Sequence, residues 1–157
     1  MKDYIIRPSI SSDAEAILEM VKYLAVQHNA LSMIVYTADD LRNVGIGKDG
    51  GAVGAIVAEK EGKVIGIALY FYRFSTWKGP TVHIEDLIVC PEGRGCGIGD
   101  ALMMAVVEMA RSKGCDRVEL DVEADNKRAM EFYKKKGFEV EEWNAAKLYL
   151  NGKEKNL

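Results

Sequence analysis

The chain has 157 residues, of which 48% are hydrophobic and 29% are charged, and its formal net charge is −3. This length and composition suit one globular domain that buries a sizeable core. A negative net charge argues against nonspecific nucleic-acid binding, which needs a basic surface. No apolar stretch reaches the roughly 18 residues of a membrane span, and the N-terminus lacks the layout of a signal peptide. We therefore expect a cytoplasmic protein that binds neither nucleic acid nor membrane.

Cysteine and histidine usage narrows the class further. The three cysteines, Cys90, Cys96 and Cys115, form no CxxC pair and are odd in number. That usage suits a reducing compartment better than a disulfide framework. His28 and His83 are far apart in the sequence and have no ligand-like neighbours, so no metal site is predicted.

Hydrophobic periodicity predicts a mixed α/β fold, in which helices and strands are combined as in the α+β class. Alternating or continuous apolar runs between turn residues indicate strands at 4–7, 55–59, 64–74, 81–89, 116–123, 138–142 and 147–150. Apolar spacing of three and four indicates helices at 12–27, 37–45, 98–113 and 126–136. We see no internal repeat, linker or second domain, so residues 1–157 are predicted to form a single domain with a frayed tail at 151–157.

Three of these helices carry clear end signals. Ser12 followed by Glu15, and Thr37 followed by Asp40, have the spacing of a capping box. Asp125 or Asn126 is expected to cap the last helix, and Gly137 stands where helices commonly end in a left-handed residue.

The stretch from His83 to Ala101 joins a strand to a helix through a glycine-rich turn. Because Gly95, Gly97 and Gly99 have no side chains, an anion can approach the backbone N–H groups at the start of that helix closely. The helix dipole adds about half a positive charge at the same end. The turn is therefore a predicted anion site.

Two well-known phosphate sites do not fit this turn. A P-loop needs Gly-Lys-Ser/Thr, whereas Gly99 is followed by Asp100. A dinucleotide-binding turn needs a further glycine where Asp100 stands, and it follows the first strand of its domain instead of lying past the middle of the chain.

The remaining pattern, Arg94-x-x-Gly97-x-Gly99 between a strand and a helix, resembles motif A of the GCN5-related N-acetyltransferases (GNAT). Trp77, Glu85-Asp86, Asn126 and Phe132-Tyr133-Lys134 make the chain similar to the diamine branch, which acetylates spermidine, spermine or thialysine. The resemblance runs from Ile5 to about Leu148. It implies a central mixed, mostly antiparallel sheet of six or seven strands flanked by about four helices. It also implies acetyl-CoA as co-substrate and a homodimer.

The resemblance assigns the cofactor to three segments. The backbone of the strand before the turn would pair with the pantetheine amides as an added strand does. The turn would hold the pyrophosphate, with a charge-assisted contact from Arg94. The start of the last helix would flank the pantetheine arm. The predicted cofactor-binding residues are Leu87, Ile88, Val89, Arg94, Gly95, Cys96, Gly97, Ile98, Gly99, Asp100, Asn126 and Ala129.

Acetyl transfer to an amine also needs a base and an acid. An alkyl ammonium has a pKa near 10.4, so at pH 7 only about one molecule in 2,500 is free amine. Glu85 is the predicted base, acting directly or through water. Tyr133 is the predicted acid toward the departing thiolate, as the resemblance implies. Asp86 is either a surface carboxylate or a substrate contact, and its direction depends on whether its strand is regular or bulged.

The acceptor is less sharply indicated. In the resembling family the segment between the first two helices lines the acceptor site, and polyamine-acetylating members carry carboxylates there and before the tryptophan. Residues 27–33 and Thr76 supply none here. A thialysine-like amino acid is therefore as compatible with the sequence as spermidine. The candidate substrate-binding residues are Trp77, Asp86, Glu119 and Asp121. A protein or peptide acetyltransferase of the same fold, or a noncatalytic acyl-CoA-binding sensor, remain alternatives.

Overall fold

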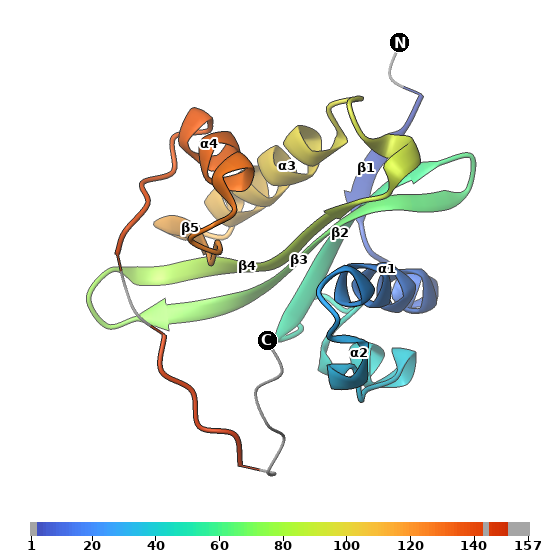
Figure 1. Cartoon of the computed structure of the whole chain (residues 1–157), viewed down its shortest axis with the longest axis horizontal. Helices are drawn as coiled ribbons and strands as arrows, with labels where there is room; N and C mark the ends of the chain where they lie inside the picture. Colours follow the sequence, from blue (N-terminus) through green and yellow to red (C-terminus); the bar gives the residue numbers. More distant parts are fainter. Residues whose placement is uncertain (1–2, 143–144, 151–157) are drawn as a thin grey trace. The chain divides into compact units, whose positions relative to one another are not determined.

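The computed structural model of the chain (Figure 1) describes residues 3–142 and 145–150. Its contacts divide the chain into a large unit, Met1–Leu120, and a small unit, Asp121–Leu157. The single domain expected over residues 1–157 stays a prediction, and the tail expected at 151–157 lies outside the described residues.

The large unit contains one mixed sheet. Its strands follow the order β1-β2-β3-β4-β5, with β1 Ile5–Pro8, β2 Val53–Lys60, β3 Lys63–Ser75, β4 Gly79–Val89 and β5 Arg117–Leu120. The first four strands are antiparallel neighbours, and β5 runs parallel to β4. The mixed, mostly antiparallel sheet expected from the sequence is confirmed.

The described residues also form four α-helices. They are α1 Ala14–Gln27, α2 Ala38–Val44, α3 Ile98–Ser112 and α4 Lys127–Lys135, and single 3-10 turns occur at Ser11–Asp13, Leu31–Met33 and Pro91–Gly93. In the large unit, α1 and α2 lie on one face of the sheet and α3 lies on the other (Figure 1). In the described part of the chain, no helix has the length and apolar character that crossing a bilayer requires.

The strand count differs from the expected six or seven, because residues 138–142 and 147–150 form no strand. Glu139, Glu141 and Glu142 leave few apolar side chains in the first segment, and Leu148 and Leu150 are 86% and 87% exposed in the second. Segments that bury so little apolar surface gain little from joining a sheet, although their residue types alternate as strands do. β5 likewise ends at Leu120 and not at the expected residue 123.

The core under α1 and α2 is built from alternate residues of the strands. Val57, Ile67 and Leu69 are at most 5% exposed and pack with Ile17 and Leu41 of the helices. On the opposite face, α3 buries the apolar stripe Ile98, Leu102, Met103 and Val106. The sheet is thus covered on both faces where β2, β3 and β4 run side by side.

The predicted ends of α2 and α4 are confirmed, whereas the Ser12–Glu15 capping box expected for α1 is wrong, because the Asp13 carboxylate accepts from the Ile10 N–H at 2.7 Å and Glu15 pairs with Arg42. Thr37 accepts a hydrogen bond from the Asp40 N–H, and the Asp40 carboxylate accepts from the Thr37 N–H at 2.8 Å. Asn126 caps α4 by accepting from the Ala129 N–H at 3.1 Å. Gly137 has φ of 89°, and the Phe138 N–H returns to the Tyr133 carbonyl, which is the usual glycine exit from a helix.

Candidate active site

A β-bulge interrupts β4 at Glu85. Asp86 is paired with Leu69 of β3 and Ile84 is paired with Tyr70, so Glu85 has no partner residue in β3. A bulge reverses the alternation of side chains beyond it. Asp86 therefore shares the face of Leu69, toward α1 and α2, while Glu85 is exposed.

The environment of Asp86 suits proton transfer. Burial, with a smaller contribution from the Glu85 charge, raises the pKa of the Asp86 carboxyl from 3.8 to about 6. Desolvation disfavours the charged form of a carboxyl, and a like charge nearby adds to this. Asp86 is thus a considerably stronger base than an ordinary aspartate.

Tyr36 interacts electrostatically with Asp86 and Glu85. The sequence alone did not single it out as a site residue. It lies in the segment between α1 and α2, is half-buried, and packs against the core under these helices. Burial raises the pKa of the Tyr36 hydroxyl, and the charges of Asp86 and Glu85 raise it further. One indication of Tyr36 was available from the sequence, because the segment between the first two helices was expected to line the acceptor site. That expectation did not single out Tyr36, because one tyrosine forms no periodic pattern.

Beyond the bulge, β4 has a free edge within the large unit. β4 and β5 pair only from Thr81 to Ile84. Among residues 3–120, no strand continues along that edge of β4 at residues 85–89. Leu87, Ile88 and Val89, the predicted partners of the pantetheine amides, lie in this segment.

The glycine-rich turn is open. Gly95 and Gly97 have φ of 77° and 76°, and a Cβ atom built on either would meet no heavy atom within 4 Å. Gly97 is the N-cap of α3 and supplies no side-chain cap to the first N–H groups of that helix. Gly95, Cys96 and Gly97 are exposed. These features fit an anion held by backbone amides.

The other turn residues differ in what they present. The Ile98 side chain is 2% exposed, so only its backbone faces an incoming ligand, while Gly99 and Asp100 are half-buried in the first turn of α3. The Arg94 guanidinium lies toward α1, where it donates to the Tyr23 hydroxyl at 3.3 Å and to the Val89 carbonyl at 3.4 Å. The phosphate contact of Arg94 stays a prediction.

A second polar group joins three strands and is called the Glu119 cluster: Glu119, Arg73, Arg117 and His83. Glu119 accepts from Arg73 at 2.6 Å and pairs with Arg117 at 2.9 Å, and its Oε1 lies 3.4 Å from Nδ1 of His83. His83 is 7% exposed and stacks on Phe71 with ring centroids 4.8 Å apart. The Glu119 carboxylate is thus already paired with two guanidinium groups.

Two further candidates for acceptor binding are Trp77 and Asp121. Trp77 is 92% exposed at the end of the β3–β4 hairpin. Asp121 is exposed and begins the small unit. Their contacts with a substrate stay predictions. Within residues 3–142 and 145–150, no three His, Cys, Asp or Glu side chains are grouped as a metal site would need.

The small unit holds the predicted acid. Tyr133 lies on α4 half-buried, edge-on to Phe132 and Phe138 with ring centroids 5.3 Å and 5.6 Å away. Burial raises the pKa of its hydroxyl, so the group stays protonated at neutral pH. The roles of Tyr133, Asn126 and Ala129 toward the cofactor stay predictions.

Comparisons with known proteins agree with this geometry. The family described as Acetyltransferase (GNAT) matches residues 18–138. A thialysine N-epsilon-acetyltransferase of Bos taurus is 34% identical over 151 residues, and the match covers 89% of each protein.

Solved structures give the same picture. An acetyltransferase of Trypanosoma brucei is 31% identical and superposes with a TM-score of 0.69 over 94% of this chain and 100% of that one. An aminoglycoside N-acetyltransferase solved in complex with CoA has a TM-score of 0.75 over 94% of this chain and 95% of that one. The latter is 23% identical, which shows a shared fold.

Proposed function

Because the chain belongs to the GNAT family and is an acetyltransferase, we propose that it transfers the acetyl group of acetyl-CoA to a primary amine of a small molecule. The acceptor is a diamine, a polyamine or a thialysine-like amino acid. The observation that carries this proposal is the bulge in β4, which turns Asp86 toward α1 and α2 and exposes Glu85 where the pairing with β5 ends.

The carboxylates at the bulge can accept the proton that the amine must lose before it attacks. The attacking nitrogen must lose a proton, and at pH 7 only about one alkyl ammonium in 2,500 has done so. A carboxyl whose pKa is about 6 is deprotonated at pH 7 and accepts that proton more readily than an ordinary aspartate. Glu85, which is exposed, accepts it through water. The Glu85–Asp86 pair is therefore the proposed base.

The transfer itself is a direct attack with both substrates bound. The amine nitrogen forms a bond to the thioester carbonyl carbon, the carbon–sulfur bond breaks, and the amine proton passes to the carboxylate pair. Tyr133 gives its hydroxyl proton to the leaving sulfur and regains one from solvent. The ammonium loses two protons in all, one before the attack and one as the amide forms, so the products are an N-acetyl amide, the thiol of CoA and one proton. A tyrosine hydroxyl carries its proton at neutral pH, and burial, which raises the pKa of Tyr133, keeps it protonated there.

Acetyl-CoA is held as co-substrate at the sites named above. The open backbone at Gly95 and Gly97 supports pyrophosphate binding, and the free edge of β4 supports pairing with pantetheine. The homodimer and the cytoplasmic location expected from the sequence remain predictions.

A turnover assay tests the proposal. Purified protein is incubated with acetyl-CoA and a panel of small amines, and thiol release is followed. We expect thiol release to depend on the amine. Binding of acetyl-CoA with no turnover of any amine would instead support the acyl-CoA sensor, and turnover of lysine-containing peptides alone would support the protein acetyltransferase.

A further inference from the structure

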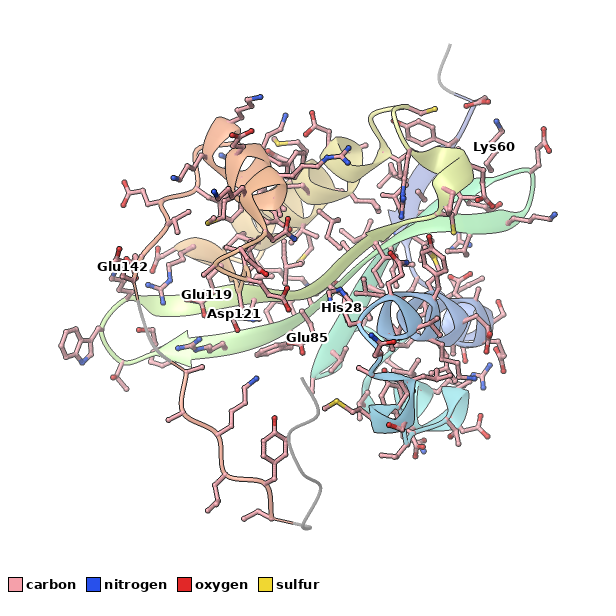
Figure 2. The ribbon with its side chains drawn as sticks, viewed as in Figure 1. His28, Lys60, Glu85, Glu119, Asp121 and Glu142 are labelled. Atoms are coloured by element: carbon pink, nitrogen blue, oxygen red, sulfur yellow. The ribbon has the colours of Figure 1, made fainter. Side chains whose placement is uncertain are left out.

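The Glu119 cluster and the proposed amine site lie on one face of the sheet. Asp86 shares the face of Leu69 through their pairing, and Phe71, two residues further along β3, shares that face too. His83 is paired with Phe71 and stacks on it, and Glu119 is the β5 partner of His83. Figure 2 labels Glu85 of β4 and Glu119 of β5, the strand that pairs with β4.

The cluster has more positive than negative charge. Arg73 and Arg117 share the single carboxylate of Glu119, so the three side chains carry one positive charge in excess. A guanidinium has five N–H donors, and Glu119 occupies few of them. Nε of Arg117 is buried and has no hydrogen-bond partner among the described residues. Arg73 is about half exposed and reachable from solvent. Such an arrangement suits a carboxylate, which guanidinium groups bind by paired hydrogen bonds.

The spacing between the cluster and Asp86 matches one class of acceptor. The Arg73 guanidinium meets Glu119 at the level of the Phe71–His83 pair, and Asp86 lies at the level of Leu69. Those levels are two β3 residues apart, or about 7 Å along the strand. In an extended lysine-type amino acid, six bonds separate the carboxyl carbon from the terminal nitrogen, which spans about 7.5 Å. One end of such a molecule can therefore lie at the cluster while the other lies at the bulge.

We propose that Arg73 and Arg117 form a carboxylate-binding site for the acceptor, which is then an amino acid with a terminal amine on its side chain. This inference rests on the proposed function and narrows its acceptor class. Glu119 holds the two guanidinium groups in place, and the α-carboxylate binds to their remaining N–H groups. Polyamines lack an α-carboxylate. In a lysine residue within a peptide, the α-carboxyl group is part of an amide bond and carries no charge. The cluster therefore selects against both.

The test compares acceptors that differ only in the carboxylate. At saturating acetyl-CoA, kcat/KM is measured for L-lysine and thialysine, for L-lysinamide, and for cadaverine. We expect kcat/KM for the two acids to exceed that for the amide by about 10- to 100-fold, mainly through KM, because a site built to hydrogen-bond a group rejects an analogue without it.

Variants assign the preference to the cluster. Arg73→Gln and Arg117→Gln are each expected to reduce the acid-to-amide ratio to within about threefold of one, and Arg73→Lys, which keeps the charge, to restore part of it. Arg111→Gln is the matched control, because Arg111 forms a similar ion pair with Glu108 on the surface of α3. Its ratio should equal that of the wild-type protein.

The outcomes separate this inference from the function on which it rests. Equal kcat/KM for lysine and lysinamide in the wild-type protein overturns the inference and leaves small-amine acetylation standing. An acid preference that survives both glutamine variants also overturns it. Absence of acetyl transfer to every amine overturns the proposed function, and the inference with it. The comparison of lysine with lysinamide uses the wild-type protein, so it can overturn the inference even if a variant misfolds.

Discussion

Asp86 is paired with Leu69 across the sheet, whereas its neighbour Glu85 has no partner residue in β3. One inserted residue thus gives two adjacent carboxylates different surroundings. Asp86 is partly removed from water and has a raised pKa of about 6, while Glu85 stays exposed. Two predictions follow from the buried member of the pair.

The first concerns the pH dependence of activity. If Asp86 accepts the amine proton, the ratio of wild-type to Asp86→Asn kcat/KM should rise from pH 5 to pH 7 and level off above, because the carboxylate form becomes populated as the pH passes about 6. At pH 7 we expect the variant to be slower by about 100-fold or more. Initial rates of thiol release across this range measure the ratio. A ratio that does not change with pH would remove Asp86 from proton transfer.

The second prediction concerns stability. Asp86→Asn, which lowers activity, should raise the stability of the folded protein near neutral pH. The pKa of Asp86 in the folded protein lies above its value of 3.8 in the unfolded chain, so the folded state retains a proton that the unfolded state releases. Stability therefore falls as the pH rises from about 4 to about 6, by up to about 3 kcal/mol at pH 7.

Asp86→Asn removes this charge. We expect its stability relative to the wild-type protein to improve between pH 4 and pH 7, as measured by urea unfolding at both values. Asp49→Asn is the control, since the Asp49 side chain is 99% exposed and should show little dependence. Identical differences in unfolding free energy at pH 4 and pH 7 would contradict the burial of a charged Asp86.

The third prediction concerns Tyr133. A Tyr133→Phe variant keeps the ring that packs on Phe132 and Phe138 but loses the proton offered to the leaving sulfur. We expect kcat to fall by about 100-fold or more, with the affinity for acetyl-CoA nearly unchanged. Tyr149→Phe, at another partly exposed tyrosine, is the control. Wild-type kcat in Tyr133→Phe would exclude Tyr133 as the acid.

The sequence predicted the parts of the fold that depend on local pattern. The strand, glycine-rich turn and helix from residue 81 to 112, and the caps at Thr37 and Asn126, follow from residue types a few positions apart. The helices and the first five strands were predicted within a few residues. Residues 138–142 were wrongly predicted as a strand because alternation alone does not show whether a segment has apolar surface to bury.

Features that depend on register were not predictable in this way. The sequence identified Glu85 and Asp86 but not which of them is buried, because that depends on a bulge defined only by pairing with β3. Glu119 was considered a receiver for an amine, yet Arg73 lies 46 residues away in sequence and meets it only after β3, β4 and β5 assemble. Tyr36 approaches Asp86 for the same kind of reason.

The fourth prediction separates backbone strain from cofactor binding at the glycine-rich turn. Gly97 and Gly62 have nearly the same φ, 76° and 77°, and a Cβ atom on either meets no heavy atom within 4 Å. Alanine at either position should therefore destabilise the protein by a similar amount, about 1 to 2 kcal/mol.

Only Gly97 precedes α3, whereas Gly62 lies in the turn between β2 and β3. We expect Gly97→Ala to raise KM for acetyl-CoA by about tenfold or more, because its methyl group occupies the space where the pyrophosphate meets the first N–H groups of α3. Gly62→Ala should leave that KM unchanged. If both variants lose stability equally and both keep the wild-type KM, the pyrophosphate does not bind at this turn.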